Sequence, residues 1–326
     1  MTGGHDTPVV GQSAAWHEWL AAIASERMHH AWLLSGARGL GKRAFARAAA
    51  AELVRQPGAP LPEVDGHPDI LILDHLPAND DEAKKKAEGK PYQTKRNITV
   101  DQVRGMIRRL VTKPTLGERR AIVIDPADDM EKGAVNALLK ALEEPPAGTY
   151  FLLVTHQPGR LLPTIRSRCR VLRFAALDGE ELDAVIRREA PQADASARTA
   201  AIAAAQGSPG MALDIVEHDL GGIHALMVRI LAQGDPEFAL RGALADEMGG
   251  RPARDRQLAA LELARAVLVQ GLRDAPRRRQ LAIIDAYGAL TRLATQAPTY
   301  NFDAGLLIME IGGLLASAAM PREAAR

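Results

Sequence analysis

The chain has 326 residues, 47% of them hydrophobic and 25% charged, which is the composition of an ordinary globular protein and a length that favours two or three domains. Its formal net charge of +1 excludes a polycation, so any nucleic-acid contact has to come from a local basic patch. The single cysteine, Cys169, excludes an intrachain disulfide and a multi-cysteine zinc site, while short apolar runs and the lack of a signal pattern predict a cytoplasmic protein without a membrane span.

The first half of the chain alternates short apolar runs with helical patterns. Residues 30–36 predict a buried strand that enters a glycine-rich loop, and residues 42–56 predict the helix after it, ended by Pro57 and Gly58. Such alternation predicts an α/β fold with a parallel, doubly wound sheet. The other predicted strands are 69–75, 119–125, 149–156 and 169–174, and the other predicted helices are 99–114 and 133–146.

After Phe174 the strand signals stop and only helical patterns follow. Residues 178–216 carry short helical patterns, and residues 220–326 form long Ala- and Leu-rich ones. Residues 77–97 hold many charges and few apolar side chains, and we interpret them as a solvated, mobile loop. The breaks in the C-terminal helical region are predicted at Gly234–Pro236, Gly249–Pro252, Pro276 and Pro298.

The stretch SGARGLGKRAFA, residues 35–46, matches the phosphate-binding pattern G-x-x-x-x-G-K. Its glycines, Gly36, Gly39 and Gly41, would let backbone N–H groups surround phosphate oxygens, and Lys42 would reach the β- and γ-phosphates. The next position should carry a Ser or Thr hydroxyl for magnesium, but it holds Arg43, whose charge would lie where the metal binds. The pattern predicts a degenerate nucleotide site and leaves open whether ATP is still bound without hydrolysis.

A second motif of nucleotide hydrolysis is also incomplete. The apolar run that ends in AIVIDPAD, residues 121–128, supplies Asp125 as a metal-binding carboxylate. The position of the glutamate that would activate water holds Pro126, which cannot act as a base, and Asp128 fits the following turn. Two independent losses favour a site that no longer hydrolyses ATP.

The most specific segment is NALLKALEEPPAGTYFLLVTHQPGRLLPTIRSRC, residues 136–169. Together with motifs in the same order upstream, it resembles the clamp-loader branch of the AAA+ ATPases, as found in bacterial DNA polymerase III, over most of residues 8–215. The resemblance implies an AAA+ P-loop NTPase sheet domain, a small helical lid and an all-helical collar for oligomerisation. The upstream motifs are GQ (11–12), HAWLLSGARGLGK (30–42), GHPDI (66–70), VDQVR (100–104) and VIDPADDM (123–130), and the implied domains are 1–175, 176–218 and 219–326.

The resemblance also implies roles for single residues. Arg168, in the Ser-Arg-Cys motif, would be an arginine finger that reaches ATP held by a neighbouring subunit. Thr155 would occupy the sensor-one position beside the γ-phosphate, and Gly210 stands where active loaders carry a sensor-two arginine. Residues 57–66 contain no cysteine, so the zinc module of many relatives is absent and no metal is expected.

Two functions remain open at this point. One is a non-motor clamp-loader subunit, without catalysis of its own, that supplies Arg168 to a neighbour; the other is a motor-type ATPase that tolerates Arg43. Pro126 and Gly210 favour the first. The resemblance implies other clamp-loader subunits (gamma/tau and delta) as partners, and the sliding clamp and primed DNA through the complex, within a polymerase III holoenzyme at the nucleoid.

Overall fold

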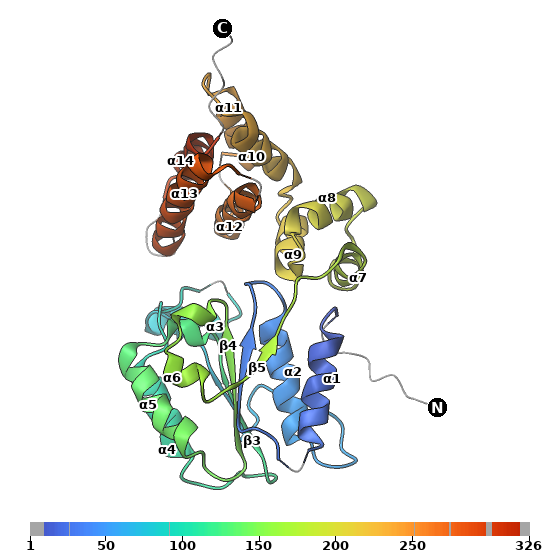
Figure 1. Cartoon of the computed structure of the whole chain (residues 1–326), viewed down its shortest axis with the longest axis vertical. Helices are drawn as coiled ribbons and strands as arrows, with labels where there is room; N and C mark the ends of the chain where they lie inside the picture. The colour runs from blue at the N-terminus through green and yellow to red at the C-terminus, as the bar shows by residue number, and fades with distance from the viewer. Residues whose placement is uncertain are drawn as a thin grey trace. The chain divides into compact units, whose positions relative to one another are not determined.

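A computed structural model describes residues 10–25, 27–90, 92–250, 252–273, 275–297 and 302–319. The chain divides into two compact units, residues 1–176 and 177–326 (Figure 1). The lid and the collar that the sequence predicts both fall in the second unit, and the boundary between them stays a prediction.

The first unit is built on a five-stranded sheet in the order β2-β3-β4-β1-β5, in which all neighbouring strands pair in parallel (Figure 1). This confirms the predicted fold class, and each predicted strand is present. Strand β1 lies between the central strand β4 and the edge strand β5, so the loop that follows β1 lies at the carboxyl edge of the sheet, next to its outermost strand. The strands are β1 (Ala31–Ser35), β2 (Ile70–Leu73), β3 (Arg120–Ile124), β4 (Thr149–Thr155) and β5 (Arg170–Arg173).

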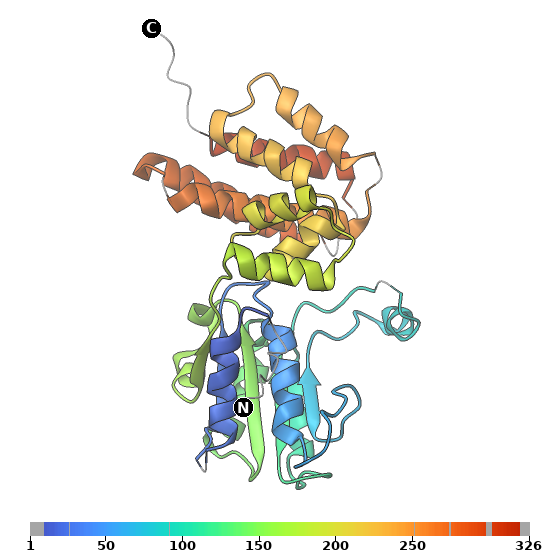
Figure 2. The ribbon, with the colours of Figure 1, turned by 90° about the vertical axis from the view of Figure 1, so that its right-hand side faces the viewer.

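Helices cover both faces of the sheet because side chains along each strand alternate between two separate apolar cores. Along β1, Trp32 and Leu34 pack with α1 and α2, whereas Ala31 and Leu33 pack with α4 and α5. Figures 1 and 2 show the two layers, with α1 and α2 side by side on one face. The helices of this unit are α1 (Ser13–Ile23), α2 (Lys42–Val54), α3 (Asp80–Ala87), α4 (Val100–Arg109), α5 (Lys132–Glu143) and the short α6 (Pro163–Arg166).

Helix α4 ends earlier than the sequence predicts. It begins at a capping box, in which Thr99 and Gln102 bond to each other's backbone N–H groups, and it ends at Arg109 instead of continuing to Pro114. The reason is the buried guanidinium of Arg120, which donates to the carbonyl oxygens of Arg109, Thr112 and Lys113. These bonds hold the chain after Arg109 in a turn.

The interpretation of residues 77–97 as a loop is wrong for its first half, because this stretch contains helix α3. Asn79 caps the helix by accepting the N–H of Glu82, and acidic residues in its first turn and lysines in its last turn match the helix dipole. The helix stands on an arm whose two ends pair through Pro77 and Thr94. Figure 2 shows this arm projecting from the sheet.

Helices are the only regular secondary structure among the described residues of the second unit, as predicted. Its early helices pack on the later ones, since α8 contacts α10 and α9 contacts α12. The predicted breaks at Gly234, Gly249 and Pro276 are confirmed, and Pro298 lies outside the described residues. None of the helices in the described part of the chain is long and apolar enough to cross a bilayer. The helices are α7 (Gly179–Glu189), α8 (Ala195–Ala205), α9 (Pro209–Glu217), α10 (Gly221–Gln233), α11 (Ala239–Met248), α12 (Arg254–Arg273), α13 (Arg277–Gln296) and α14 (Ala304–Ser317).

Candidate functional site

The loop between β1 and α2 needs each of the three glycines that the pattern contains. Gly39 and Gly41 have φ angles of 80° and 78°, in the left-handed region where other residues are strained. A Cβ atom on Gly36 would lie 2.7 Å from the carbonyl oxygen of Phe174. The loop therefore keeps the backbone conformation on which a phosphate-binding turn depends.

Lys42 points into this loop and bonds to it. Its Nζ donates to the carbonyl oxygens of Gly36, at 2.7 Å, and Ala37, at 2.5 Å, and the residue is only 2% exposed. Burial lowers the pKa of Lys42 to about 8, against the opposing pull of Asp125 and Asp128. The ammonium group that would bind phosphate thus holds the loop's own carbonyl groups.

Arg43 lies between two carboxylates at the carboxyl edge of the sheet. Its guanidinium is 3.0 Å from Asp74 and 3.5 Å from Asp125. Burial raises the pKa of the Asp125 carboxyl, and the charge of Arg43 acts against that rise. A magnesium ion needs oxygen ligands where this guanidinium lies, so the residues present do not fit a catalytic magnesium–ATP centre.

Thr155 and Asp128 join the ends of two neighbouring strands. The Thr155 hydroxyl, fully buried, donates to Oδ1 of Asp128 at 2.5 Å, and the backbone N–H of His156 donates to Oδ2 at 2.5 Å. Asp128 lies in the short turn after β3, where the sequence placed it. This bond fastens the end of β4 to the turn after β3, and it uses the one hydrogen of the Thr155 hydroxyl. Burial, followed by the charge of Lys42, lowers the pKa of His156 to about 4.

Arg168 lies in the connection between α6 and β5. Its Nη2 is 2.7 Å from Oε1 of Glu143, the last residue of α5, and its Nη1 donates to the carbonyl oxygen of Thr164 at 3.0 Å. The side chain is 35% exposed. The guanidinium is therefore held at two points and still reaches the surface.

The sheet separates Arg168 from the chain's own phosphate loop. Arg170 pairs with Trp32 near the start of β1, whereas the loop follows Ser35 at the end of that strand. At about 3.3 Å per residue these levels are about 10 Å apart, and Arg168 precedes Arg170 by two further residues. The predicted finger and the predicted loop thus lie at opposite edges of the sheet and do not form one site.

Sequence reasoning missed Asp74 and Glu143, the carboxylates that pair with Arg43 and Arg168. The position of Asp74, one residue after β2 at the edge that carries the phosphate loop, was a usable signal. Glu143 lies in the Leu-Glu-Glu-Pro-Pro stretch that pointed to the family, but nothing in that pattern names its partner.

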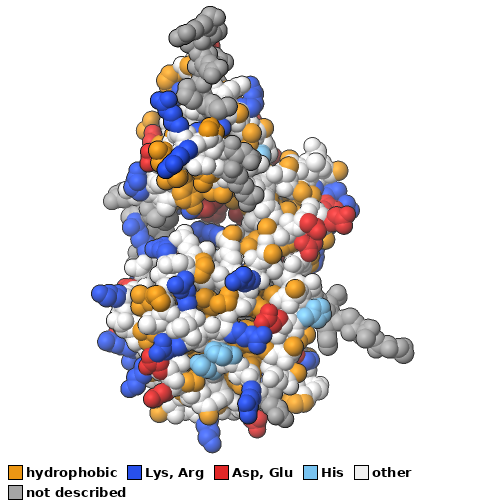
Figure 3. All heavy atoms as spheres, viewed as in Figure 1, with side chains coloured by type: hydrophobic (Ala, Val, Ile, Leu, Met, Phe, Trp, Pro, Cys, Tyr) orange, Lys and Arg blue, Asp and Glu red, His pale blue; other side chains and the backbone are white. Residues whose placement is uncertain are grey.

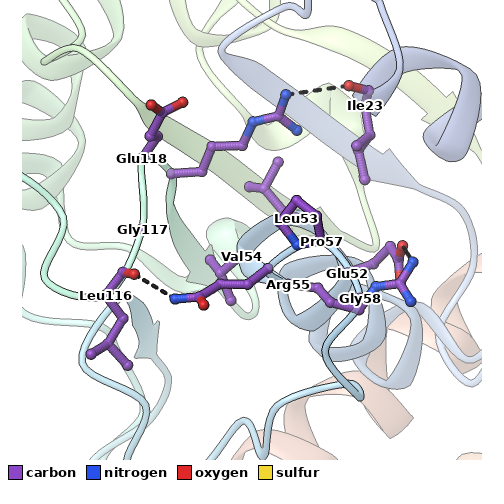
Figure 4. Close-up of a pocket in the computed structure, with 12 residues that line it drawn as sticks. Ile23, Glu52, Leu53, Val54, Arg55, Pro57, Gly58, Leu116, Gly117 and Glu118 are labelled. Carbon is purple, nitrogen blue, oxygen red and sulfur yellow. Dashed lines mark hydrogen bonds and ion pairs between the residues drawn. The ribbon is translucent and has the colours of Figure 1, made fainter.

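A further hollow lies at the amino edge of the sheet. It has a volume of about 720 Å³ and is bounded by the end of α2 and the turn before β3 (Figure 4). Two of its lining residues, Gln56 and Arg119, donate hydrogen bonds to the carbonyl oxygens of Leu116 and Ile23. No residue of the phosphate loop lines it.

Figure 3 shows Lys and Arg side chains spread over the α4–α6 face of the first unit, with apolar side chains between them.

The chain is similar in sequence to subunits of DNA polymerase III. The sequence model of the family "DNA polymerase III, delta subunit" matches residues 11–178. The chain is 36% identical to DNA polymerase III subunit delta' of Pseudomonas aeruginosa over 211 residues, which are 61% of this chain and 58% of that protein. It is 30% identical to subunit delta' of Escherichia coli over 301 residues, 86% of this chain and 83% of that protein. A tau subunit from Salmonella typhimurium is 32% identical over 177 residues, 53% of this chain and 26% of that protein.

Proposed function

The chain belongs to the DNA polymerase III delta subunit family, and on that premise we propose that it is the non-motor, delta-prime-type subunit of a clamp loader. In this role it helps to load the sliding clamp onto primed DNA during replication. Its partners are the gamma/tau and delta subunits, and it reaches the clamp and DNA through the complex. Such a subunit works in the cytoplasm, with the replisome at the nucleoid.

Within the complex, Arg168 acts as an arginine finger on ATP held by a neighbouring subunit. The observation that carries this proposal is the placement of its guanidinium, which is held at two points but reaches the surface at the edge opposite the chain's own loop. Guanidinium has five N–H donors, so donors remain for phosphate oxygens. In a neighbour's site they would offset the charge that develops on the transferred phosphoryl group.

The chain's own loop, residues 36–43, serves the fold and does not hydrolyse ATP. Arg43 takes the place of a magnesium ligand and pairs with Asp125, and Pro126 cannot activate water. Gly210, in the first turn of α9, has no side chain with which to contact a phosphate. A nucleotide bound here would be held by loop N–H groups and Lys42 and would stay intact.

The alternative is a motor-type clamp-loader ATPase of the gamma/tau kind, and the similarity to a tau subunit supports this alternative. ATP turnover by the purified chain, alone and with primed DNA, separates the two. We expect no turnover above background, and no change in Lys42→Ala. If the wild-type chain turns over ATP and Lys42→Ala does not, the chain is instead a motor-type ATPase.

A second measurement tests the finger in the assembled loader. We expect Arg168→Ala to remove most turnover at the site it serves, since arginine fingers contribute about 10³–10⁵ in kcat. Arg166→Ala, an exposed arginine two residues away, is the matched control and should leave turnover unchanged. Equal turnover in the two variant loaders, with both complexes intact, would remove Arg168 from this role.

A further inference from the structure

We propose that Glu143 is the positioning residue of Arg168: its carboxylate holds the guanidinium in the pose from which it meets a neighbour's ATP. This inference rests on the proposed function of Arg168. The contact is direct, with Nη2 of Arg168 2.7 Å from Oε1 of Glu143, and a second bond to the Thr164 carbonyl oxygen fixes the plane of the guanidinium.

Both partners stand on rigid backbone. Leu142, next to Glu143, is 1% exposed, and its carbonyl oxygen lies 2.9 Å from Nε2 of His30. On the other side, the backbone N–H of Arg168 donates to the carbonyl oxygen of Ile165, which is fully buried. Cys169, the next residue, packs against the same apolar core. The geometry of the pair is therefore set by the fold, and the side chains contribute only the last contact.

Helix electrostatics alone disfavour a glutamate at this position. Glu143 is the last residue of α5, where the partial charge of the helix dipole is negative, and Glu144 adds a second carboxylate. An acid at a helix C-terminus is unfavourable, and a basic residue there is the favoured choice. The guanidinium of Arg168 supplies the missing positive charge, so the pair accounts for an acid that the helix itself does not explain.

Neighbouring arginines are held differently, which makes the pairing specific. Arg170 bonds to Glu18 through Nε and Nη2 and stacks on the Trp32 ring, 4.9 Å from its centroid. These contacts join β5 to α1, and both partners of Arg170 belong to the first unit. Of the described arginines between residues 166 and 173, Arg168 is the one paired with the last residue of α5.

The effect of Glu143 is preorganisation. A free arginine has to lose rotamer entropy when it meets the transition state, whereas a guanidinium already held by a carboxylate and a carbonyl has lost most of it. Because the finger acts on charge that develops in the transition state, loss of Glu143 should lower kcat and leave the KM for ATP unchanged.

The test uses the complete loader, reconstituted with this chain as wild type, Arg168→Ala, Glu143→Ala, Glu144→Gln and the double variant Glu143→Ala/Arg168→Ala. The fall in kcat of Arg168→Ala sets the full scale. On a logarithmic scale, Glu143→Ala should lower kcat by at least about half as much as Arg168→Ala does. The KM for ATP should stay within about twofold of wild type. Glu144→Gln, which changes the adjacent exposed carboxylate, should match wild type.

The double variant is the decisive arm, because residues that act through one another are not additive. It should be no slower than Arg168→Ala alone. A Glu143→Ala loader that turns over ATP as fast as wild type, or faster, overturns the positioning role, and so does a further loss in the double variant. If Arg168→Ala itself has no effect, the proposed function fails and not merely this extension of it.

Discussion

At the scale of the residue, the guanidinium of Arg43 lies where related phosphate-binding sites hold a metal ion. It pairs with Asp74 and with the buried Asp125, so its charge stabilises two carboxylates that would otherwise repel each other. The side chain of Arg43 is 61% exposed, and solvent screening limits each contact to a surface value. The guanidinium nevertheless places a positive charge between these two carboxylates.

We expect Arg43→Gln to destabilise the first unit at pH 7 by about 0.5–1 kcal/mol, or about 1–4 °C in melting temperature. The pKa of Asp125 is raised by burial and restrained by Arg43, so removing the arginine raises this pKa further. Arg43 stabilises only the ionised carboxylate. Its contribution is therefore complete above the higher pKa that Asp125 has without the arginine, and it is lost as the pH falls through the pKa of Asp125 in the wild type. Calorimetry from pH 7 downward measures this.

The matched control for that prediction is Arg47→Gln, on the same helix. Arg47 pairs at 2.6 Å with Asp65, whose side chain is 78% exposed. A smaller loss is expected because that carboxylate is solvated whether or not it is paired. An Arg43→Gln loss that is no greater than the control, or that persists after the carboxylates are protonated, would contradict the built-in cation.

The parts of the site that are local in sequence could be predicted, and the parts that depend on pairing across the fold could not. The loop was readable because Gly39, Gly41 and Lys42 are required by the backbone of one turn. Asp74 is 31 residues from Arg43, and only the sheet order brings β2 and β3 together at that edge. The pairing of Glu143 with Arg168 depends in the same way on how α5 meets α6.

At the scale of the element, apolar periodicity predicted the strands and helices α2, α4 and α5, but α1 and α3 were missed. Strands β1 to β4 are apolar runs that are largely buried, a signal that stays visible without any tertiary information, whereas only Leu172 is buried in the edge strand β5. Helix α3, DDEAKKKA, has no apolar face, and its stability comes from the Asn79 cap, charge order and one buried carboxylate. That carboxylate, Glu82, accepts the Gln93 N–H at 2.6 Å and the Lys85 ammonium at 2.7 Å.

We expect Glu82→Ala to loosen the arm without affecting the rest of the unit. Glu82 is 8% exposed and joins the helix to the returning chain, so its removal leaves the Gln93 N–H without its charged acceptor. Loss of such a bond costs about 1.5–3 kcal/mol, which corresponds to local opening at least about tenfold more often. Tryptic cleavage between Lys84 and Lys90 should accelerate by that factor while the melting temperature changes little.

Glu88→Ala is the control for the arm, because Glu88 is an exposed carboxylate that pairs with Lys90 at 2.7 Å. It should leave cleavage within about twofold of wild type. If Glu82→Ala is cleaved no faster than this control, the buried carboxylate does not hold the helix to its arm.

At the scale of the whole molecule, the second unit keeps apolar side chains on its surface. Leu281 and Ile284 of α13 are 64% and 53% exposed and lie three residues apart, on one side of the helix. In a collar that joins clamp-loader subunits, contact with a neighbour would cover this pair. Completing the burial of each side chain contributes about 1 kcal/mol.

We therefore expect Leu281→Lys/Ile284→Lys to weaken association with the other loader subunits at least about 30-fold, the equivalent of about 2 kcal/mol. The isolated chain should unfold as wild type does, because substitutions at exposed positions change stability by about 0.5 kcal/mol or less. Interferometry with immobilised gamma/tau and delta subunits measures the affinity. Leu61→Lys, an exposed leucine of the first unit at 55%, controls for the added charge and should bind as wild type. If the double variant associates as tightly as wild type, Leu281 and Ile284 stay exposed to solvent in the complex. Assembly then uses another surface of the helical unit.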